Sequence, residues 1–275
     1  MIVGNDISKY QGNIDWNKYK SNTNFVIIKA SEGIGYTDSQ LAVYQSKARE
    51  LGIPLGYYHF ARPDLKNDAA HEADWFLQTI GELKEGEILC LDFEVTYNDA
   101  VNWCKNFLDR IKFMTNGCKA FIYLNQSQCG EYDWKSIANA DYPLWIAAYT
   151  PDSQYFSGAW LTAAMQQWTS SQQVPGIMGN VDGDHFFGDV NQFKAYGYKK
   201  PVPPPATPPA PPAEPPVQPP VQPPAPPVEP PVQPPVVPVI DYKKIVEEIK
   251  AITYGKGWWW VRLNKIKDVF VKYGV

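Results

Sequence analysis

A proline-rich tract near the carboxyl end prevents this chain from forming one continuous core. From Pro201 to Val239 the sequence repeats Pro-Pro-Val-Gln-like units and holds 21 of the 26 prolines. Proline fixes φ and lacks an amide donor, so the tract favours extended polyproline II and serves as a semi-rigid spacer. Its length and regularity favour a spacer over a ligand for another protein's groove. We predict a main domain at 1–198, a linker at 199–239 and a small module at 240–275.

Charge and hydropathy exclude several classes of protein. The formal net charge is only −4, which does not indicate a nucleic-acid partner. No run of eighteen apolar residues occurs, so we expect no stable membrane insertion. The amino terminus lacks a basic segment followed by an apolar one, which predicts synthesis in a cytoplasm without a signal peptide. The four cysteines lack C-x-x-C spacing, so we expect free, buried thiols.

Short apolar runs alternate with helix-period segments throughout the main domain. The predicted strands are Ile2–Asp6, Phe25–Ala30, Pro54–Phe60, Ile88–Glu94, Ala120–Leu124, Pro143–Tyr149, Ala163–Thr169 and a short strand ending near Asp182. The predicted helices include Ala42–Leu51, Ala69–Thr79 and Ala100–Met114. This alternation is typical of the α/β class and predicts a (β/α) barrel of about eight strands. The gaps after the fifth strand are short, so we expect few helices in the final third.

Acidic and aromatic residues gather at the predicted strand ends. In a β/α barrel the carboxyl ends of the strands form one rim, where functional side chains lie. Carboxylates serve glycosidic bonds, and aromatic rings pack on sugar faces, so this rim suits a glycan. Its acids are Asp6, Glu32, Asp92, Glu94 and Asp182, and its other candidate residues are Tyr57, Tyr58, His59, Tyr123, Trp145, Tyr149, Gln167 and Trp168.

Asp92 and Glu94 are the candidate catalytic pair. Residues two apart on a strand point to the same side, with Cα atoms about 7 Å apart. Mutual repulsion and burial then raise a carboxyl pKa, so that one acid keeps a proton while the other stays ionised. An isolated Asp-x-Glu more often begins a solvated loop; the surrounding ring of acids favours catalysis here.

Metal binding and core packing are the alternatives for several of these residues. Three histidines without paired spacing do not form a metal site, so we interpret His59 as a hydrogen-bonded rim or core residue and expect no metal or cofactor. We interpret Asp184 and His185 as surface turn residues after one site acid. Trp145 and Trp168 fit either the core or the site.

Six motifs in order resemble glycoside hydrolase family 25, the muramidases that include many phage endolysins. They cover residues 1 to about 195 and read DISKYQG from Asp6, IKASEG from Ile28, GYYHF from Gly56, LDFE from Leu91, QWTS from Gln167 and VD from Val181. The resemblance implies a flattened barrel with eight strands and about five helices. It also implies cleavage of the β-1,4 bond between N-acetylmuramic acid and N-acetylglucosamine in peptidoglycan.

The resemblance also implies unequal roles for the acids. Glu94 is similar in position to the general acid, and Asp92 to its ionised partner, either as a nucleophile or stabiliser or as the group that orients the substrate acetamido group. Asp6 and Asp182 match the other two site acids. The sequence departs from the family pattern after Asp182, where Gly183 and Asp184 follow. A catalytically silent glycan-binding barrel is the alternative function, because fold alone does not prove chemistry.

The module at 240–275 differs in charge from the rest of the chain. It carries eight Lys or Arg against four Asp or Glu, and its apolar spacing predicts two short helices. Trp258, Trp259 and Trp260 cannot all face inward from one helix. We expect binding to the wall and to anionic wall polymers, with self-association or a membrane surface as alternatives. A wall substrate without a signal peptide is typical of a phage endolysin of a Gram-positive host, released from the host cytoplasm to act on the wall, with a bacterial autolysin as the alternative.

Overall fold

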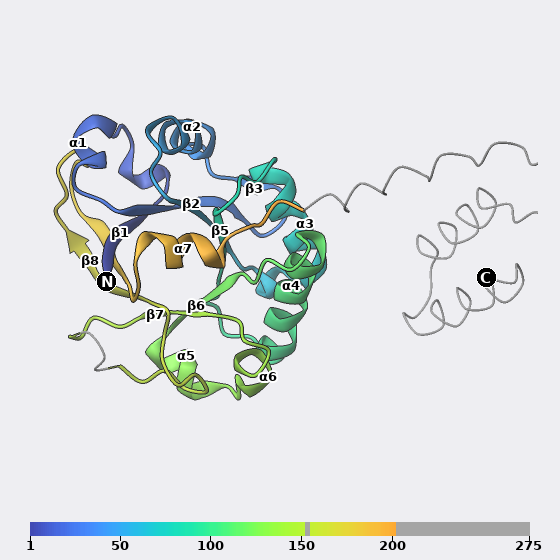
Figure 1. The fold of residues 1–275 in the computed structure, drawn as a ribbon. Helices are drawn as coiled ribbons and strands as arrows, with labels where there is room; N and C mark the ends of the chain where they lie inside the picture. Colours follow the sequence, from blue (N-terminus) through green and yellow to red (C-terminus); the bar gives the residue numbers. More distant parts are fainter. Residues whose placement is uncertain (152–154, 202–275) are drawn as a thin grey trace, which may run out of the picture. The chain divides into compact units, whose positions relative to one another are not determined.

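A computed structural model describes residues 1–151 and 155–201 (Figure 1). The predicted linker and the module with its three tryptophans lie outside the described residues, apart from the first residues of the linker. None of the helices in the described part of the chain is long and apolar enough to span a membrane.

Eight strands close into a barrel, which confirms the predicted fold. They are β1 (Ile2–Ile7), β2 (Phe25–Glu32), β4 (Leu55–Phe60), β5 (Ile88–Asp92), β6 (Phe121–Asn125), β7 (Leu144–Ala147), β8 (Met165–Gln172) and β9 (Val181–Phe186). The order is β1-β9-β8-β7-β6-β5-β4-β2, and the parallel pairing of β1 with β2 closes the ring. A short strand, β3 (Tyr36–Thr37), forms a hairpin with the end of β2.

β9 runs against its neighbours, which corrects one expectation. It pairs antiparallel with both β8 and β1, whereas the other barrel pairs are parallel. Asp182 therefore lies near the start of its strand and not at its end. Because the strand is reversed, its start lies at the same rim as the carboxyl ends of the parallel strands, so Asp182 still reaches that rim.

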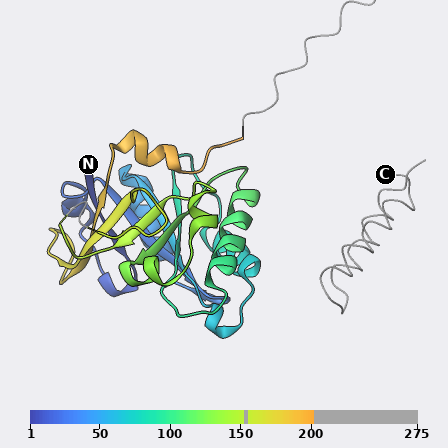
Figure 2. The ribbon, with the colours of Figure 1, turned by 90° about the horizontal axis from the view of Figure 1, so that it is seen from below.

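Helices cover the barrel unevenly. The longest are α2 (Leu41–Leu51), α3 (Ala69–Ile80) and α4 (Ala100–Met114), and α3 packs beside α4 in both ribbon views (Figures 1 and 2). The short helices are α1 (Trp16–Lys20), α5 (Gln126–Glu131), α6 (Lys135–Ala138) and α7 (Val190–Tyr196). No helix separates β7 from β8 in the described residues, which agrees with the predicted helix-poor final third. The described chain has seven α-helices, whereas about five were expected. Two of the seven, α5 and α6, are only six and four residues long.

Strand alternation separates two apolar layers. Inward side chains such as Phe25, Ile88, Phe121 and Met165 fill the barrel. Outward side chains such as Val26 and Ile28 pack with residues of the helices and build the outer core. Phe193 of α7 packs on Phe25 and Phe186, with ring centroids 4.8 and 5.4 Å apart, and closes one end of the barrel (Figure 1). The candidate functional side chains lie at the other end of the barrel.

The four cysteines are free and buried, as expected. Cys90 faces the barrel interior, and Cys104 packs in the outer core on α4. Both thiols have a pKa raised well above the ordinary value, mainly by burial. They act as small apolar side chains.

Candidate active site

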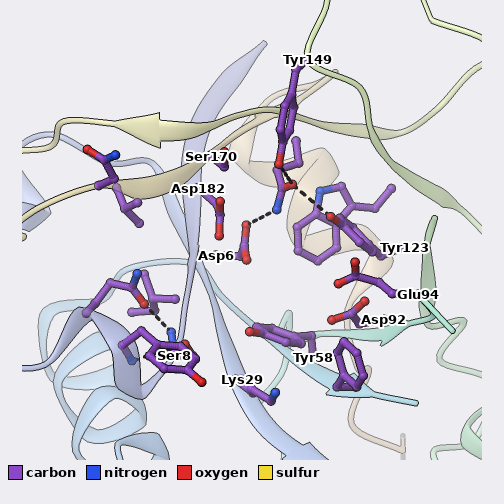
Figure 3. Close-up of a pocket in the computed structure, with 18 residues that line it drawn as sticks. Asp6, Ser8, Lys29, Tyr58, Asp92, Glu94, Tyr123, Tyr149, Ser170 and Asp182 are labelled. Carbon is purple, nitrogen blue, oxygen red and sulfur yellow. Dashed lines mark hydrogen bonds between the residues drawn. The ribbon is translucent and has the colours of Figure 1, made fainter. Parts of the chain in front are cut away.

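A cavity of about 480 Å³ opens at the rim of the barrel opposite α7 (Figure 3). Its acids are Asp6, Asp92, Glu94 and Asp182, and Lys29 is the cation in its lining. Its aromatic lining consists of Tyr10, Tyr58, Phe60, Tyr123, Trp145 and Tyr149. The predicted site therefore forms one pocket with the composition of a glycan site.

Inward strand positions supply most of this lining. Asp6 extends from β1, Lys29 from β2, Tyr58 from β4 and Asp92 from the last position of β5. Glu94 lies two residues beyond Asp92, just past the end of β5. Figure 3 shows Asp92 beside Glu94 and Asp6 beside Asp182, as two acid pairs within one pocket.

Gln167 links three groups of the pocket. Its Nε2 donates to Asp6 Oδ2 at 2.9 Å. Its Oε1 accepts from the Tyr123 hydroxyl at 3.0 Å and from the Tyr149 hydroxyl at 3.1 Å. In this arrangement the amide nitrogen, which can only donate, faces Asp6, and the amide oxygen, which can only accept, faces the two hydroxyls. Gln167 thus orients the Asp6 carboxyl through Oδ2, and Oδ1 of Asp6 is left to interact with the other acids.

Burial and the neighbouring Asp182 carboxylate raise the pKa of Asp6 to about 8. Burial is the largest cause, and the charge of Asp182 adds to it, while the hydrogen bond from Gln167 opposes it. Asp6 is only 7% exposed. A carboxyl in this state holds a proton near neutral pH.

Asp184 is a fifth acid of the cluster, and its placement corrects our interpretation of it as a surface turn residue. It is 1% exposed and faces the barrel interior from β9. Its Oδ1 accepts from Trp145 Nε1 at 3.0 Å, and its side chain hydrogen-bonds Asp6. Burial first, and then the charge of Asp6, raise the pKa of Asp184 well above its ordinary value. Burial thus favours the neutral form of Asp184, which lies below the pocket floor.

The two members of the acid pair, Asp92 and Glu94, influence each other's pKa. Burial raises both pKa values, and the charge of Glu94 raises that of Asp92 further. The hydrogen bond between the two raises the pKa of Asp92 and lowers that of Glu94. Asp92 is 7% exposed, whereas Glu94 reaches solvent at the pocket mouth. In the empty pocket burial therefore favours the neutral form of Asp92 more strongly than that of Glu94.

Lys29 balances part of this negative charge. Its Nζ lies 2.8 Å from Glu32 Oε2 and 4.9 Å from the centroid of the Phe60 ring. Its charge lowers the pKa of both members of the acid pair. Lys29 is not among the site residues predicted from the sequence. Its inward position on β2, two residues after the buried Ile27, is the signal that could have identified it.

Four predicted site residues do not line the pocket. Tyr57 and His59 point outward from β4 into the helix layer, where the Tyr57 hydroxyl accepts from Gln45. Glu32 lies in a neighbouring hollow. Trp168 stacks on His185 with ring centroids 5.4 Å apart. Tyr58 alone of the Tyr57–His59 run faces the pocket, because neighbouring strand residues point to opposite faces.

His59 belongs instead to a buried polar chain. Its Nδ1 lies 2.9 Å from Ser31 Oγ and its Nε2 lies 2.8 Å from Glu72 Oε2. The same Glu72 oxygen accepts from the Arg62 backbone amide at 3.1 Å. All three side chains are fully buried, so this chain ties β2, β4 and α3 together and meets no substrate. Trp145, by contrast, serves both the core and the pocket lining.

No group of three or more His, Cys, Asp or Glu in the described ranges is arranged to hold a metal ion. A closed barrel with an acid cluster and aromatic walls at the carboxyl ends of its strands defines a class of glycan-cleaving enzyme.

Residues 5–177 match glycosyl hydrolases family 25. The chain belongs to this family, and its barrel is a glycoside hydrolase of the muramidase (lysozyme) class. It is 31% identical over 193 residues to the autolytic lysozyme of Clostridium acetobutylicum, a match that covers 67% of this chain and 56% of that relative. The chain thus spans little more than half the length of that protein.

Solved structures share the fold. The bacterial lysozyme from Streptomyces coelicolor superimposes with a TM-score of 0.65 at 26% identity, covering 71% of this chain and 96% of that one. The CTP1L endolysin superimposes with a TM-score of 0.61 at 29% identity, covering 71% of this chain and 70% of that one.

Proposed function

We propose that the whole protein hydrolyses peptidoglycan at the β-1,4 bond between N-acetylmuramic acid and N-acetylglucosamine. The observation that carries this proposal is the acid pair, whose two carboxyl pKa values are both raised, in the pocket at the rim of a family 25 barrel. An intact pair distinguishes an enzyme from a silent glycan-binding barrel. The names of the relatives, a lysozyme and an endolysin, support a wall glycan as the substrate.

Glu94 is the proposed general acid. It reaches solvent at the pocket mouth, where a leaving sugar oxygen can meet it, whereas Asp92 lies deeper. When substrate displaces water from the mouth, the proton of the pair passes to Glu94 and then to the leaving oxygen. Asp92 is left ionised and stabilises the positive charge that develops at the sugar, either directly as a nucleophile or through the substrate acetamido group.

Asp6 and Asp182 support this step from the other side of the pocket. The pKa of each is raised, mainly by burial, and the charge of Glu94 adds to the effect on Asp182. The protonated forms of Asp6 and Asp182 can hydrogen-bond to sugar hydroxyls or to water. Tyr58, Tyr123 and Tyr149 provide rings and hydroxyls for the sugar, as their places in the lining indicate.

Glu94→Gln tests the assignment. General acid catalysis contributes about 10²- to 10⁴-fold, so we expect turnover on purified peptidoglycan to fall by that factor while wall binding is retained. Glu131→Gln, at an exposed glutamate outside the pocket, is the matched control. Mass spectrometry after borohydride reduction should show reduced muramic-acid ends from the wild type. Near-normal turnover in Glu94→Gln would contradict the role of Glu94, and reduced glucosamine ends would contradict the bond assignment.

We further propose that the protein is a phage endolysin of a Gram-positive host, which acts on the wall after release from the host cytoplasm. The likeness to the CTP1L endolysin supports this source, whereas the likeness to an autolytic lysozyme favours the alternative of a bacterial autolysin. Expression in a host without a pore-forming partner should leave the cells intact. Lysis in the absence of any pore would favour the autolysin.

Residues 240–275 are proposed to bind the wall. Their excess of positive charge and the run Trp258-Trp259-Trp260 support attraction to anionic wall polymers. Deletion of these residues should weaken pelleting of the protein with whole cells. Unchanged pelleting would favour the alternative role in self-association.

A further inference from the structure

A second hollow of about 360 Å³ adjoins the catalytic pocket. The two cavities share Tyr10 and Lys29 in their linings. The hollow, here called the side groove, extends from these residues to Lys9, Ile34, Tyr36 and Leu65. A ligand whose reacting bond lies in the catalytic pocket can therefore extend directly into the side groove.

Most charges in the side groove already have partners. Glu32 accepts from Lys29 Nζ at 2.8 Å and from Arg62 Nη1 at 2.9 Å. Arg62 also pairs with Asp64 at 2.9 Å. The buried Asp38 accepts from the backbone amides of Lys9 at 3.1 Å and of Gln40 at 2.9 Å.

Lys9 is the cation of the side groove that has no carboxylate partner within residues 1–151 and 155–201. Its Nζ lies 5.4 Å from the ring centroids of both Tyr10 and Tyr36. A hydrogen bond with Tyr36, and then the charges nearby, raise its pKa, so it stays protonated. Its side chain is exposed. Lys9 thus presents a positive charge between two aromatic rings, ready for an anion from solvent.

Two exposed aliphatic side chains complete the side groove. Ile34, in the turn between β2 and β3, is 49% exposed, and Leu65, in the 3-10 turn Pro63–Leu65, is 58% exposed. A sugar hydroxyl finds no partner on such groups. A peptide with small aliphatic side chains and a free carboxylate matches both the aliphatic groups and the ammonium of Lys9.

We propose that the side groove binds the short peptide that muramic acid carries on its lactyl group, with Lys9 as the partner of a peptide carboxylate. The proposal rests on the proposed function, because the peptide is attached beside the bond that the acid pair cleaves. The catalytic pocket and its floor hold five acids and so offer a carboxylate little attraction, whereas the ammonium of Lys9 attracts one. The side groove thereby favours glycan strands that still carry their peptides.

Lys9→Gln tests this role with two substrates. One is purified peptidoglycan with intact peptides, and the other is the same glycan after an amidase has removed them. The full-length variant should lower kcat/KM on the peptide-bearing glycan about fivefold relative to its kcat/KM on the peptide-free glycan, the size expected for one exposed ion pair. The loss should shrink at high salt, since salt screens exposed charges. Lys112→Gln, at an exposed lysine outside both cavities, is the control.

Equal losses on the two glycans, or no loss on either, would overturn the proposal while leaving the glycosidase function intact. The peptide that the amidase releases from the glycan can be titrated into the full-length protein and followed by NMR. This titration gives a second readout that needs no catalysis. Saturable shifts that Lys9→Gln weakens several-fold would support the side groove even if neither glycan were cleaved. Absence of shifts, or equal shifts in the wild type and the variant, would refute it.

Discussion

Replacing Asp6 with asparagine should stabilise the protein while impairing its activity. Asparagine has nearly the same shape and carries no charge at any pH. Its oxygen can accept the bond from Gln167 Nε2. The variant therefore keeps the hydrogen bond from Gln167 and removes the repulsion between Asp6 and Asp182.

The size of the effect follows from the pKa of Asp6. It rises from its ordinary value of 3.8 to about 8 in the folded protein. Stability from this group is fully present below pH 3.8 and is lost as the pH rises to about 8, because the unfolded chain ionises first. At pH 7 the difference amounts to about 4 kcal/mol, at about 1.4 kcal/mol for each pKa unit. Since Asp182 and Asp184 share the same protons, we expect a gain of about 2 to 4 kcal/mol in the free energy of unfolding.

Denaturant unfolding of the wild type and Asp6→Asn, measured in parallel at pH 4 and pH 7, checks this expectation. The gain should fall below about 1 kcal/mol at pH 4, because this pH lies close to the ordinary carboxyl pKa of 3.8 and ionisation then stabilises the unfolded chain only slightly. Asp133→Asn, at an exposed aspartate whose side chain is 71% accessible, should change stability by less than about 0.5 kcal/mol at either pH. An Asp6→Asn protein that is no more stable than the wild type at pH 7, or equally stabilised at both pH values, would refute the reasoning.

Two further substitutions probe Lys29 and the buried polar chain. Lys29→Gln should raise the pKa values of Asp92 and Glu94, because the Lys29 charge lowers both. The alkaline limb of the pH profile of kcat/KM should therefore move to higher pH. An alkaline limb that stays in place would count against this electrostatic role. Glu72→Ala should cost at least about 2 kcal/mol of unfolding free energy, because the His59 ring and the Arg62 amide lose their acceptor in the core. A loss below about 0.5 kcal/mol in denaturant titration would contradict that account.

Local periodicity was sufficient to predict most of the barrel. The helix Ala100–Met114 has the predicted bounds, because Cys104, Leu108 and Ile111 repeat at helical spacing and are buried. The alternation of short apolar runs with such helices defined the α/β class. The short gaps after β6 correctly predicted the helix-poor final third.

The face of each strand was harder to predict. Tyr57, Tyr58 and His59 are consecutive residues of one strand. Successive side chains of a strand point to opposite faces, so either Tyr58 or the pair Tyr57 and His59 can face the pocket. Parallel barrel strands are buried on both faces, so their sequences are apolar throughout and do not mark the inner side. Tyr57 and His59 were therefore assigned to the site although they face the helices.

The sequence by itself determined the ring of acids at the strand ends and the place of Asp92 and Glu94 within it. Only the tertiary structure decided how these acids share their protons. The reversal of β9 carries Asp182 to the rim and buries Asp184 beneath Asp6, and no local pattern encodes a strand's direction. Carboxyl pKa values depend on burial and on charges that lie far apart in the chain, so they are set only when the barrel closes.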